Sequence, residues 1–142
     1  MPTSPEQNKD VIRHFLKAWN NRRPDLFDAL VAQDVVRHCP ATSAVVIQNL
    51  EQLKEFMRQD TLVFPDSVQT VVHMAAEGDL VGLWATYEGT QRGPIGPLPA
   101  TGVKAKFEFS GIFRMHNGRI AEWWMTWDNM AILRALGHLP AG

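Results

Sequence analysis

The sequence predicts an α+β fold in which helices pack on one face of a curved antiparallel sheet. Three observations support this fold class. Apolar residues recur at helical spacing in the first half of the chain, long alternating segments fill the second half, and short turns connect those segments. The 142 residues fit a single domain, residues 1–142, that can bury a substantial core.

Three helices are expected in the first half of the chain. The first begins at Ser4-Pro5-Glu6-Gln7, which combines an N-cap, a proline at the first helical position and a capping-box glutamine. Its apolar stripe consists of Val11, Ile12, Phe15, Leu16 and Trp19. A second, short helix is expected over Asp25–Val31. Asn49 with Gln52 caps a third, whose apolar side chains are Leu50, Leu53, Phe56 and Met57.

Five strands are expected. A brief strand, Val35–His38, ends before Pro40, and four longer strands follow at about residues 68–76, 80–91, 103–115 and 119–127. Glu77-Gly78-Asp79 and His116-Asn117-Gly118-Arg119 are tight hairpin turns. The segment Gly93–Gly102, with its three prolines, is a connecting loop.

The last strand carries tryptophan on both of its faces. Alternation places Ile120, Glu122, Trp124 and Thr126 on one face, and Ala121, Trp123, Met125 and Trp127 on the other. Helices on one side and a partner subunit on the other would cover both faces, since large aromatic side chains are enriched at interfaces. We therefore expect a homodimer that forms through the sheet face.

Composition excludes several classes of protein. The formal net charge is −1, so no basic field favours nucleic acid or an anionic membrane. No apolar run approaches the roughly 20 residues that span a bilayer. Residues 1–8 lack the basic start and apolar run of a signal peptide. The single Cys39 excludes an internal disulfide and fits a reducing compartment, so we expect a cytoplasmic protein.

A series of short motifs runs through the second half of the chain. They are Phe64-Pro65-Asp66, Glu77-Gly78-Asp79, the run from Gly89 to Gly102, Phe113-Arg114-Met115, Asn117-Gly118-Arg119-Ile120, Glu122 through Asp128, and Leu133-Arg134-Ala135-Leu136-Gly137. Together these motifs resemble the SnoaL-like polyketide cyclases of the nuclear transport factor two-like superfamily. The resemblance covers most of the chain and is strongest from Phe64 onward.

The resemblance implies a fold, a reaction and an acid–base residue. The implied fold is a cone, in which a strongly curved antiparallel or mixed sheet and N-terminal helices enclose a pocket. Family members cyclise polyketide esters by intramolecular aldol condensation without a metal or organic cofactor, and their acid–base aspartate matches Asp128. One carboxyl can remove a proton from the activated carbon and return one to the alkoxide if an apolar pocket raises its pKa. The implied function is therefore a cofactor-independent cyclase or isomerase that acts on an apolar, carbonyl-containing small molecule such as a polyketide ester.

The polar candidates also have purely structural interpretations. Asp128 precedes Asn129-Met130-Ala131-Ile132 and is placed to cap the terminal helix, a role that is compatible with catalysis. His38 matches a position where the family often has a pocket histidine that would assist the acid; a solvated strand-end histidine is the alternative. Glu122 either lines the pocket or forms an ion pair with Arg114 or Arg119 across the hairpin.

The aromatic side chains are the expected pocket walls. They would be core in most proteins, but in a partly hollow core they would bind a flat apolar substrate. The expected substrate-binding residues are Phe15, Trp19, Phe56, Trp84, Phe107, Glu122 and Trp124. The loop Gly93–Gly102 either covers the pocket mouth or serves as an ordinary rigid connection.

Two other functions remain open on the same scaffold. One is a module that binds or assembles without catalysis, which needs only the apolar walls. The other is a dehydratase or an epoxide hydrolase. The epoxide hydrolases of this superfamily use an Asp-Arg-Asp relay, and no second aspartate stands at a suitable strand position beside Arg114 and Asp128. The sequence has neither metal-ligand spacing nor a glycine-rich phosphate loop, so we expect no metal and no cofactor.

Overall fold

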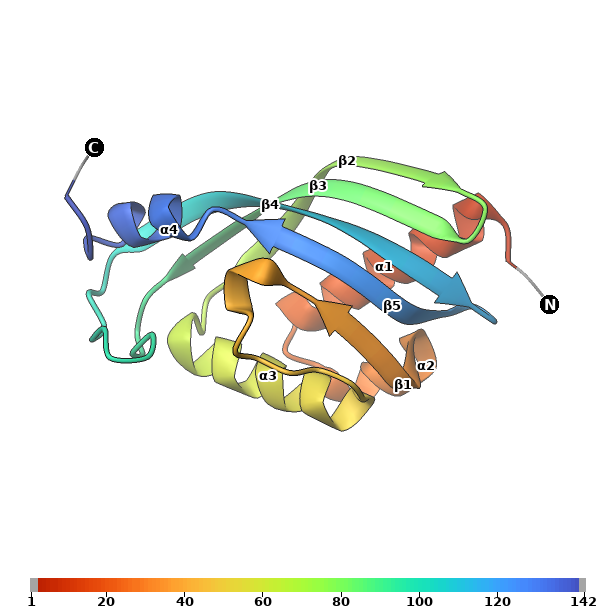
Figure 1. The fold of residues 1–142 in the computed structure, drawn as a ribbon, viewed down its shortest axis with the longest axis horizontal. Helices are drawn as coiled ribbons and strands as arrows, with labels where there is room; N and C mark the ends of the chain where they lie inside the picture. Colours follow the sequence, from red (N-terminus) through yellow and green to blue (C-terminus); the bar gives the residue numbers. More distant parts are fainter. Residues whose placement is uncertain (1–2, 141–142) are drawn as a thin grey trace.

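One curved sheet of five strands organises the molecule in the computed structural model, which describes residues 3–140 (Figure 1). The strand order is β1-β5-β4-β3-β2, with β1 parallel to β5 and the other neighbours antiparallel. The strands are β1 (Val31–His38), β2 (Val68–Glu77), β3 (Leu80–Thr90), β4 (Lys104–His116) and β5 (Arg119–Trp127). The predicted α+β class is confirmed, with a mixed sheet that is not closed.

The first and third helices begin where the sequence predicts. In α1 (Pro5–Asn20), the Ser4 hydroxyl and the Gln7 side chain form the reciprocal capping box. In α3 (Leu50–Val63), the Asn49 side chain accepts a hydrogen bond from the Gln52 N–H. A last helix, α4 (Asn129–Ala135), follows β5 directly. In Figure 1, α1 crosses behind the sheet and α3 runs along its lower edge.

The segment between α1 and α3 differs from the prediction. The expected helix Asp25–Val31 is a 3₁₀ turn, Pro24–Leu26, followed by the four-residue α2 (Phe27–Leu30). The first strand begins at Val31 rather than Val35, because Val31 pairs with Ile120 of β5. That partner lies far along the sequence, so local periodicity could not reveal the earlier start.

The core lies between α1 and the inner face of the sheet. The Phe15 ring of α1 packs edge-on against Trp123 of β5 and Phe113 of β4, with centroid distances of 5.6 and 6.4 Å. All three side chains are buried. The apolar stripe predicted for the first helix therefore covers the inner face of the two strands that carry the most aromatic residues.

A bulge changes the face assignment of β5. Arg114 pairs with Glu122, but the next residue of β4, Met115, pairs with Ile120, so Ala121 is an extra residue. The predicted alternation holds from Glu122 onward. It is wrong for Ile120, which is fully buried on the inner face together with Trp123.

Candidate active site

A cavity of about 420 Å³ lies between the inner face of the sheet and the helices. Its walls come from α1, α3, α4, all five strands, the turn Pro40–Thr42 and the loop after β3. Most of the lining is apolar, and includes Phe15, Trp19, Phe56, Phe107, Met125 and Trp127. The size and the apolar walls with few polar groups are typical of small-molecule sites.

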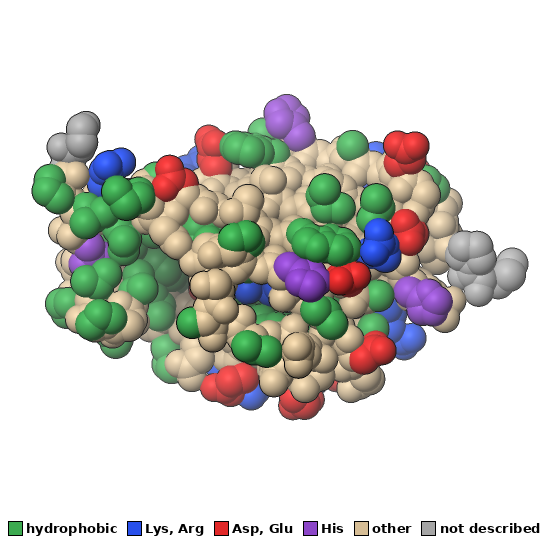
Figure 2. Space-filling view, viewed as in Figure 1, with side chains coloured by type: hydrophobic (Ala, Val, Ile, Leu, Met, Phe, Trp, Pro, Cys, Tyr) green, Lys and Arg blue, Asp and Glu red, His purple; other side chains and the backbone are tan. Residues whose placement is uncertain are grey.

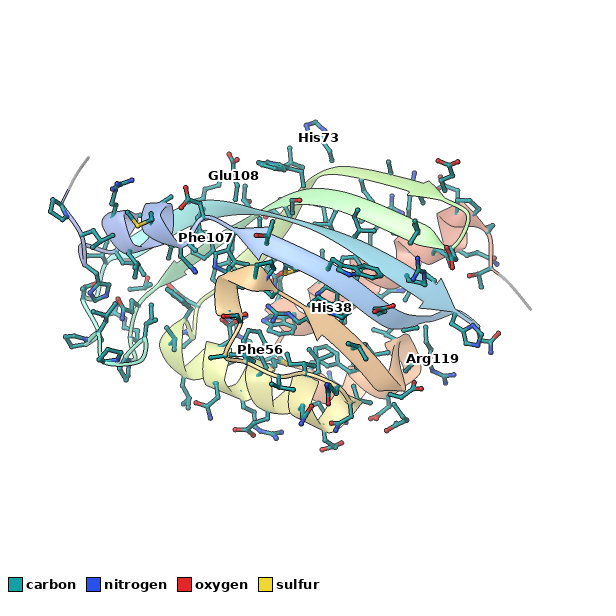
Figure 3. All side chains as sticks on the ribbon, viewed as in Figure 1. His38, Phe56, His73, Phe107, Glu108 and Arg119 are labelled. Atoms are coloured by element: carbon teal, nitrogen blue, oxygen red, sulfur yellow. The ribbon has the colours of Figure 1, made fainter. Side chains whose placement is uncertain are left out.

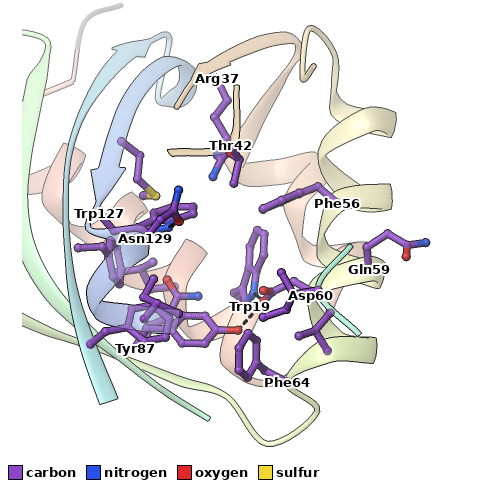
Figure 4. Close-up of a pocket in the computed structure, with 18 of the residues that line it drawn as sticks. Trp19, Arg37, Thr42, Phe56, Gln59, Asp60, Phe64, Tyr87, Trp127 and Asn129 are labelled. Carbon is purple, nitrogen blue, oxygen red and sulfur yellow. Dashed lines mark hydrogen bonds between the residues drawn. The ribbon is translucent and has the colours of Figure 1, made fainter. Parts of the chain in front are cut away.

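One carboxyl group reaches this cavity, counting the residues that the structure describes: that of Asp60 in α3. Its Oδ2 accepts hydrogen bonds from the Tyr87 hydroxyl at 2.8 Å and from the Trp19 ring N–H at 3.2 Å (Figure 4). Its Oδ1 has no hydrogen-bond partner within residues 3–140. One oxygen of Asp60 is thus held by the protein, whereas the other remains available to a bound molecule.

The helical repeat explains why Asp60 points inward. Leu50, Leu53 and Met57 are the buried residues of α3, and Asp60 follows Met57 after three more positions. Residues spaced by three and four lie on one face of a helix, so Asp60 occupies a core position of that face. Trp19 of α1 and Tyr87 of β3 then supply the donors that a carboxyl in such a place requires.

Burial raises the pKa of Asp60 above its ordinary value of 3.8. The hydrogen bonds from Tyr87 and Trp19 oppose this effect, since they stabilise the ionised form. Burial also raises the pKa of the Tyr87 phenol, which therefore stays protonated and remains a donor. A carboxyl whose pKa is moved toward neutrality is suited to take up and release protons.

Other polar side chains at the cavity are Arg37, Thr42, Gln59, Gln69 and Asn129. Arg37 is buried, and its guanidinium lies 4.5 Å from the centre of the Phe56 ring. Burial lowers the pKa of Arg37, whereas Cys39 and Asp60 oppose that effect.

Four of the predicted substrate-binding residues line the cavity: Phe15, Trp19, Phe56 and Phe107. Trp84 and Trp124 do not. They are 45% and 37% exposed on the opposite, outer face of the sheet. The expectation that they form pocket walls is corrected, because β3 and β5 direct alternate residues inward and these two fall on the outward set.

His38 lies on the outer face rather than in the cavity (Figure 3), and Glu122, its hydrogen-bond partner, does not line the cavity either. The His38 ring nitrogen Nε2 is 2.7 Å from Glu122 Oε2, and the ring stacks on Trp124 at 5.4 Å. Arg114 Nη1 is 3.5 Å from Glu122 Oε1, which is the cross-hairpin pair expected as an alternative for this residue. In β1, Arg37 faces the cavity, so its neighbour His38 faces outward.

Asp128 lies at the N-terminus of α4. Its Oδ1 accepts a hydrogen bond from the Ala131 N–H at 3.2 Å, and the side chain is exposed. It is not among the residues that line the cavity, although its neighbour Asn129 is. The structure therefore brings neither of the two predicted catalytic residues, Asp128 and His38, together with the cavity.

Asp60 and Arg37 are the cavity groups that the sequence reasoning missed. Asp60 continues the apolar stripe of α3. An ionisable side chain at such a position is uncommon, so it could have indicated a functional carboxyl. For Arg37 the signal was weaker, since a four-residue strand prediction does not reveal which face is covered.

The loop 91–103 closes one side of the cavity, where Pro94, Ile95 and Gly96 contribute to the lining. The loop is tied to the end of α3, since the N–H groups of Arg92 and Gly93 both donate to the Val63 carbonyl. A Cβ at Gly93 would stand 2.6 Å from the Leu62 carbonyl oxygen, so only glycine permits this approach.

Residues 3–140 have no grouped metal ligands and no long apolar helix. No three His, Cys, Asp or Glu side chains in this part of the chain gather in a way that would hold a metal ion. Nor does any helix there have the length and apolar character needed to cross a membrane.

Comparisons with known proteins agree with this architecture. The chain is similar to TsrD from Streptomyces laurentii, with 26% identity, a TM-score of 0.86, and coverage of 96% of this chain and 99% of TsrD. It is also similar to IdmH, a proposed polyketide cyclase from Streptomyces antibioticus, with 28% identity, a TM-score of 0.81, and coverage of 92% and 99%.

AclR, a proposed hydroxylase from Streptomyces galilaeus, shares the fold at 22% identity and a TM-score of 0.84, over 98% of this chain and 86% of AclR. A comparison with curated proteins found no match. The family model described as SnoaL-like polyketide cyclase matches residues 9–136, and the chain therefore belongs to the SnoaL-like polyketide cyclase family.

Proposed function

We propose that this protein is a cofactor-independent cyclase or isomerase that uses general acid–base catalysis on an apolar, carbonyl-containing small molecule such as a polyketide ester. Family membership supports a cyclase or isomerase kind of function. The observation that carries the proposal is the Asp60 carboxyl, which stands in an apolar cavity with one oxygen fixed by two donors and the other free.

Asp60 is the proposed acid–base residue. In its ionised form, Oδ1 takes a proton from a carbon that is activated by a neighbouring carbonyl, and an enolate forms. The enolate carbon then attacks a second carbonyl of the same molecule, which makes a carbon–carbon bond and an alkoxide. The alkoxide takes the proton from Asp60, so the carboxylate is regenerated and no atom is gained or lost.

The environment of Asp60 supports both steps. Burial raises its pKa, so the carboxylate is a stronger base than an exposed aspartate. Tyr87 and Trp19 hold the carboxyl plane in place, which reduces the reorganisation needed when the proton moves. The aromatic walls offer apolar surfaces against which a flat substrate can pack.

Asp128 and His38, the acid–base residues that the family resemblance implies, are the alternative assignment within the same function. Substitution distinguishes the two assignments. A suitable probe is ethyl 2-naphthoylacetate, a flat aromatic β-keto ester, whose activated CH₂ group exchanges hydrogen for deuterium in D₂O when a base removes its proton. The initial rate of exchange is followed by proton NMR.

The wild-type protein is expected to accelerate the exchange above the buffer rate. Asp60→Asn is expected to lose roughly a hundredfold or more of that acceleration, since a positioned general base contributes about 10²–10⁴-fold. Asp128→Asn and His38→Gln serve as matched controls and are expected to exchange at the wild-type rate. Exchange by Asp60→Asn at the wild-type rate would contradict the assignment of Asp60. No acceleration by the wild type, together with binding of the probe, would favour a non-catalytic binding module.

A dehydratase or epoxide hydrolase receives less support. A relay of two acids around a water needs a second carboxyl at the cavity, and Asp60 is the one carboxyl that lines it within residues 3–140.

The outer face of the sheet supports the predicted homodimer. Trp84, Ile112 and Trp124 are exposed there, and Ile112 pairs directly with Trp124 across β4 and β5. Figure 2 shows hydrophobic side chains gathered on this face, beside a small group of charged ones. An exposed group of large apolar side chains on an otherwise polar surface is typical of an interaction site. A second copy of the chain that packs on this face would cover them.

A further inference from the structure

Arg37 is the one basic side chain at the cavity within residues 3–140. It is only 7% exposed, and it contributes to the cavity lining. Arginine is rarely buried to this extent unless a partner neutralises it. The surroundings of Arg37 therefore indicate which kind of molecule the cavity binds.

The described residues provide no carboxylate partner for Arg37. No Asp or Glu oxygen of residues 3–140 lies within 4.0 Å of the guanidinium, and the hydrogen bond that the side chain makes there is a long one, 3.3 Å, from Nη1 to the Thr42 hydroxyl. Cys39 and Asp60 both favour the charged form of Arg37, but Cys39 is not a carboxylate, and Oδ2 of Asp60 already accepts hydrogen bonds from Tyr87 and Trp19. A guanidinium does not lose its proton in proteins, so this is a buried positive charge without a direct counter-ion.

Two aromatic rings lie next to the guanidinium. The guanidinium carbon lies 4.5 Å from the centre of the Phe56 ring and 5.7 Å from that of Trp127. Figure 4 shows these two rings on different sides of Arg37. Cation–π contacts of this kind occupy the faces of the guanidinium and leave its edge, which carries the N–H donors. An edge with parallel N–H groups matches the two oxygens of a carboxylate.

The positions of Arg37 and Asp60 separate the binding of an anionic group from proton transfer. Figure 4 shows Arg37 at one end of the cavity and Asp60 at the other, with aromatic side chains between them. A flat molecule that spans the cavity would meet a fixed cation at one end and a proton-transferring carboxyl at the opposite end. This arrangement orients the molecule, because an anionic group can be satisfied only at the Arg37 end.

We propose that the substrate is an acid: a flat apolar carbonyl compound that carries a free carboxylate, which the edge of the Arg37 guanidinium binds. This inference rests on the proposed function, which assigns the cavity to a carbonyl substrate, and it narrows the substrate class from polyketide esters in general to molecules that also contain a carboxylate. Arg37 is a binding and orienting residue, and Asp60 remains the group that moves protons.

The test uses two probes of nearly equal shape, 2-naphthoate and its neutral analogue 2-naphthamide. Their binding to the full-length wild-type protein is measured by isothermal titration calorimetry at pH 7.5. The wild type is expected to bind naphthoate roughly tenfold to a hundredfold more tightly than naphthamide, because hydrogen bonds to charged groups are the stronger ones. Equal or tighter binding of naphthamide by the wild type overturns the role of Arg37 and leaves the cavity as a small-molecule site.

A substitution then tests whether Arg37 causes the preference for naphthoate over naphthamide. In Arg37→Met, which keeps the length and the aromatic packing of the side chain, the preference for naphthoate is expected to disappear. Arg58→Met makes the same change on the solvent face of α3, where Arg58 pairs with Glu55, and should keep the wild-type preference. A preference that survives in Arg37→Met overturns the proposal. If neither probe binds to the wild type, both this inference and the assignment of the cavity fail, which separates that outcome from failure of the inference alone.

Discussion

The hydroxyl of Tyr87 donates a hydrogen bond of 2.8 Å to Oδ2 of Asp60, across the gap between β3 and α3. This bond stabilises the ionised carboxyl and so limits the rise in pKa that burial causes. It also decides which of the two carboxyl oxygens faces a bound molecule. The pair is therefore the best place to adjust the proposed acid–base chemistry without removing the carboxyl.

Tyr87→Phe is expected to raise the pKa of Asp60 further, since the substitution removes a donor that favours the charged form. The pH at which deuterium exchange into ethyl 2-naphthoylacetate reaches half of its maximum should move upward. The measurement is the exchange rate as a function of pH for both proteins. Asp66→Asn is a suitable control, because Asp66 pairs with Thr90 outside the cavity. An unchanged profile in Tyr87→Phe would mean that Asp60 does not set the pH dependence.

Asp60 is also expected to make the protein less stable as the pH rises. Its pKa is higher in the folded chain than the ordinary 3.8, so the folded state binds the proton more tightly and the free energy of unfolding falls from about pH 3.8 up to the folded pKa. Each pKa unit of difference corresponds to about 1.4 kcal/mol.

Asn has no such titration, so the stability of Asp60→Asn relative to the wild type should increase with pH over that interval. Urea unfolding of both proteins between pH 4 and pH 8 measures this difference. Groups with lowered pKa values, such as Asp66, contribute equally to both proteins and cancel. If the difference in the free energy of unfolding between the two proteins does not change with pH, the pKa of Asp60 is not raised in the folded state.

Asp128 is expected to act as a helix cap. Asp128→Ala should lower the free energy of unfolding by about 1 kcal/mol, because the Ala131 N–H loses its acceptor. Asp128→Asn should change it by only a few tenths of a kcal/mol, since asparagine is an equally good cap. Chemical denaturation provides both values. If Asp128→Asn instead keeps its stability but loses deuterium exchange, the acid–base role belongs to Asp128.

The exposed face of the sheet gives a prediction about assembly. Ile112→Glu places a charge in the middle of the apolar surface opposite Trp124 and is expected to convert a dimer into a monomer. Sedimentation velocity measures the change. Leu62→Glu introduces the same charge at a side chain that is 66% exposed on α3 and should leave the dimer intact. A wild-type protein that sediments as a monomer at micromolar concentration would contradict the predicted homodimer.

The contact between the loop 91–103 and α3 is expected to be intolerant of even one methyl group. Gly93→Ala should lower the free energy of unfolding by about 1–3 kcal/mol, because the new Cβ would meet backbone that cannot move aside. Gly82→Ala is the matched control, since its Cβ would have no neighbour nearer than 4.0 Å. Equal stability of the two variants would show that the loop can shift away from α3.

Local patterns predicted the elements well and the contents of the site less well. The capping box at Ser4 and the apolar stripe that contains Phe15 depend on neighbours within one or two helical turns, and both are found. The face on which Ile120 lies depends on a bulge that is defined by pairing with β4, and the alternation of β5 alone does not show it. The face on which His38 lies could not be predicted from β1 alone either, because the packing of α3 decides which face of β1 is covered.

The site residues illustrate a second limit. Family resemblance directs attention to Asp128, because its position in the motif matches. Asp60 is recognised only when Trp19 and Tyr87, distant in sequence, are seen to donate to it. A buried carboxyl is defined by its surroundings, and these come from three separate elements.

Because Arg37 and His38 alternate between the two faces of β1, the composition of the cavity depends on the number of residues that precede them in this strand. These residues, with Val36, are held in register against Glu122, Trp123 and Trp124, whereas the pairing between Val31 and Val36 is irregular. An inserted residue in that irregular stretch is absorbed locally. An insertion between Val36 and Arg37 would turn the guanidinium to the outer face of the sheet and the His38 imidazole into the cavity. A slip of one residue in β1 would thus remove the cationic end of the cavity without a change in any other wall.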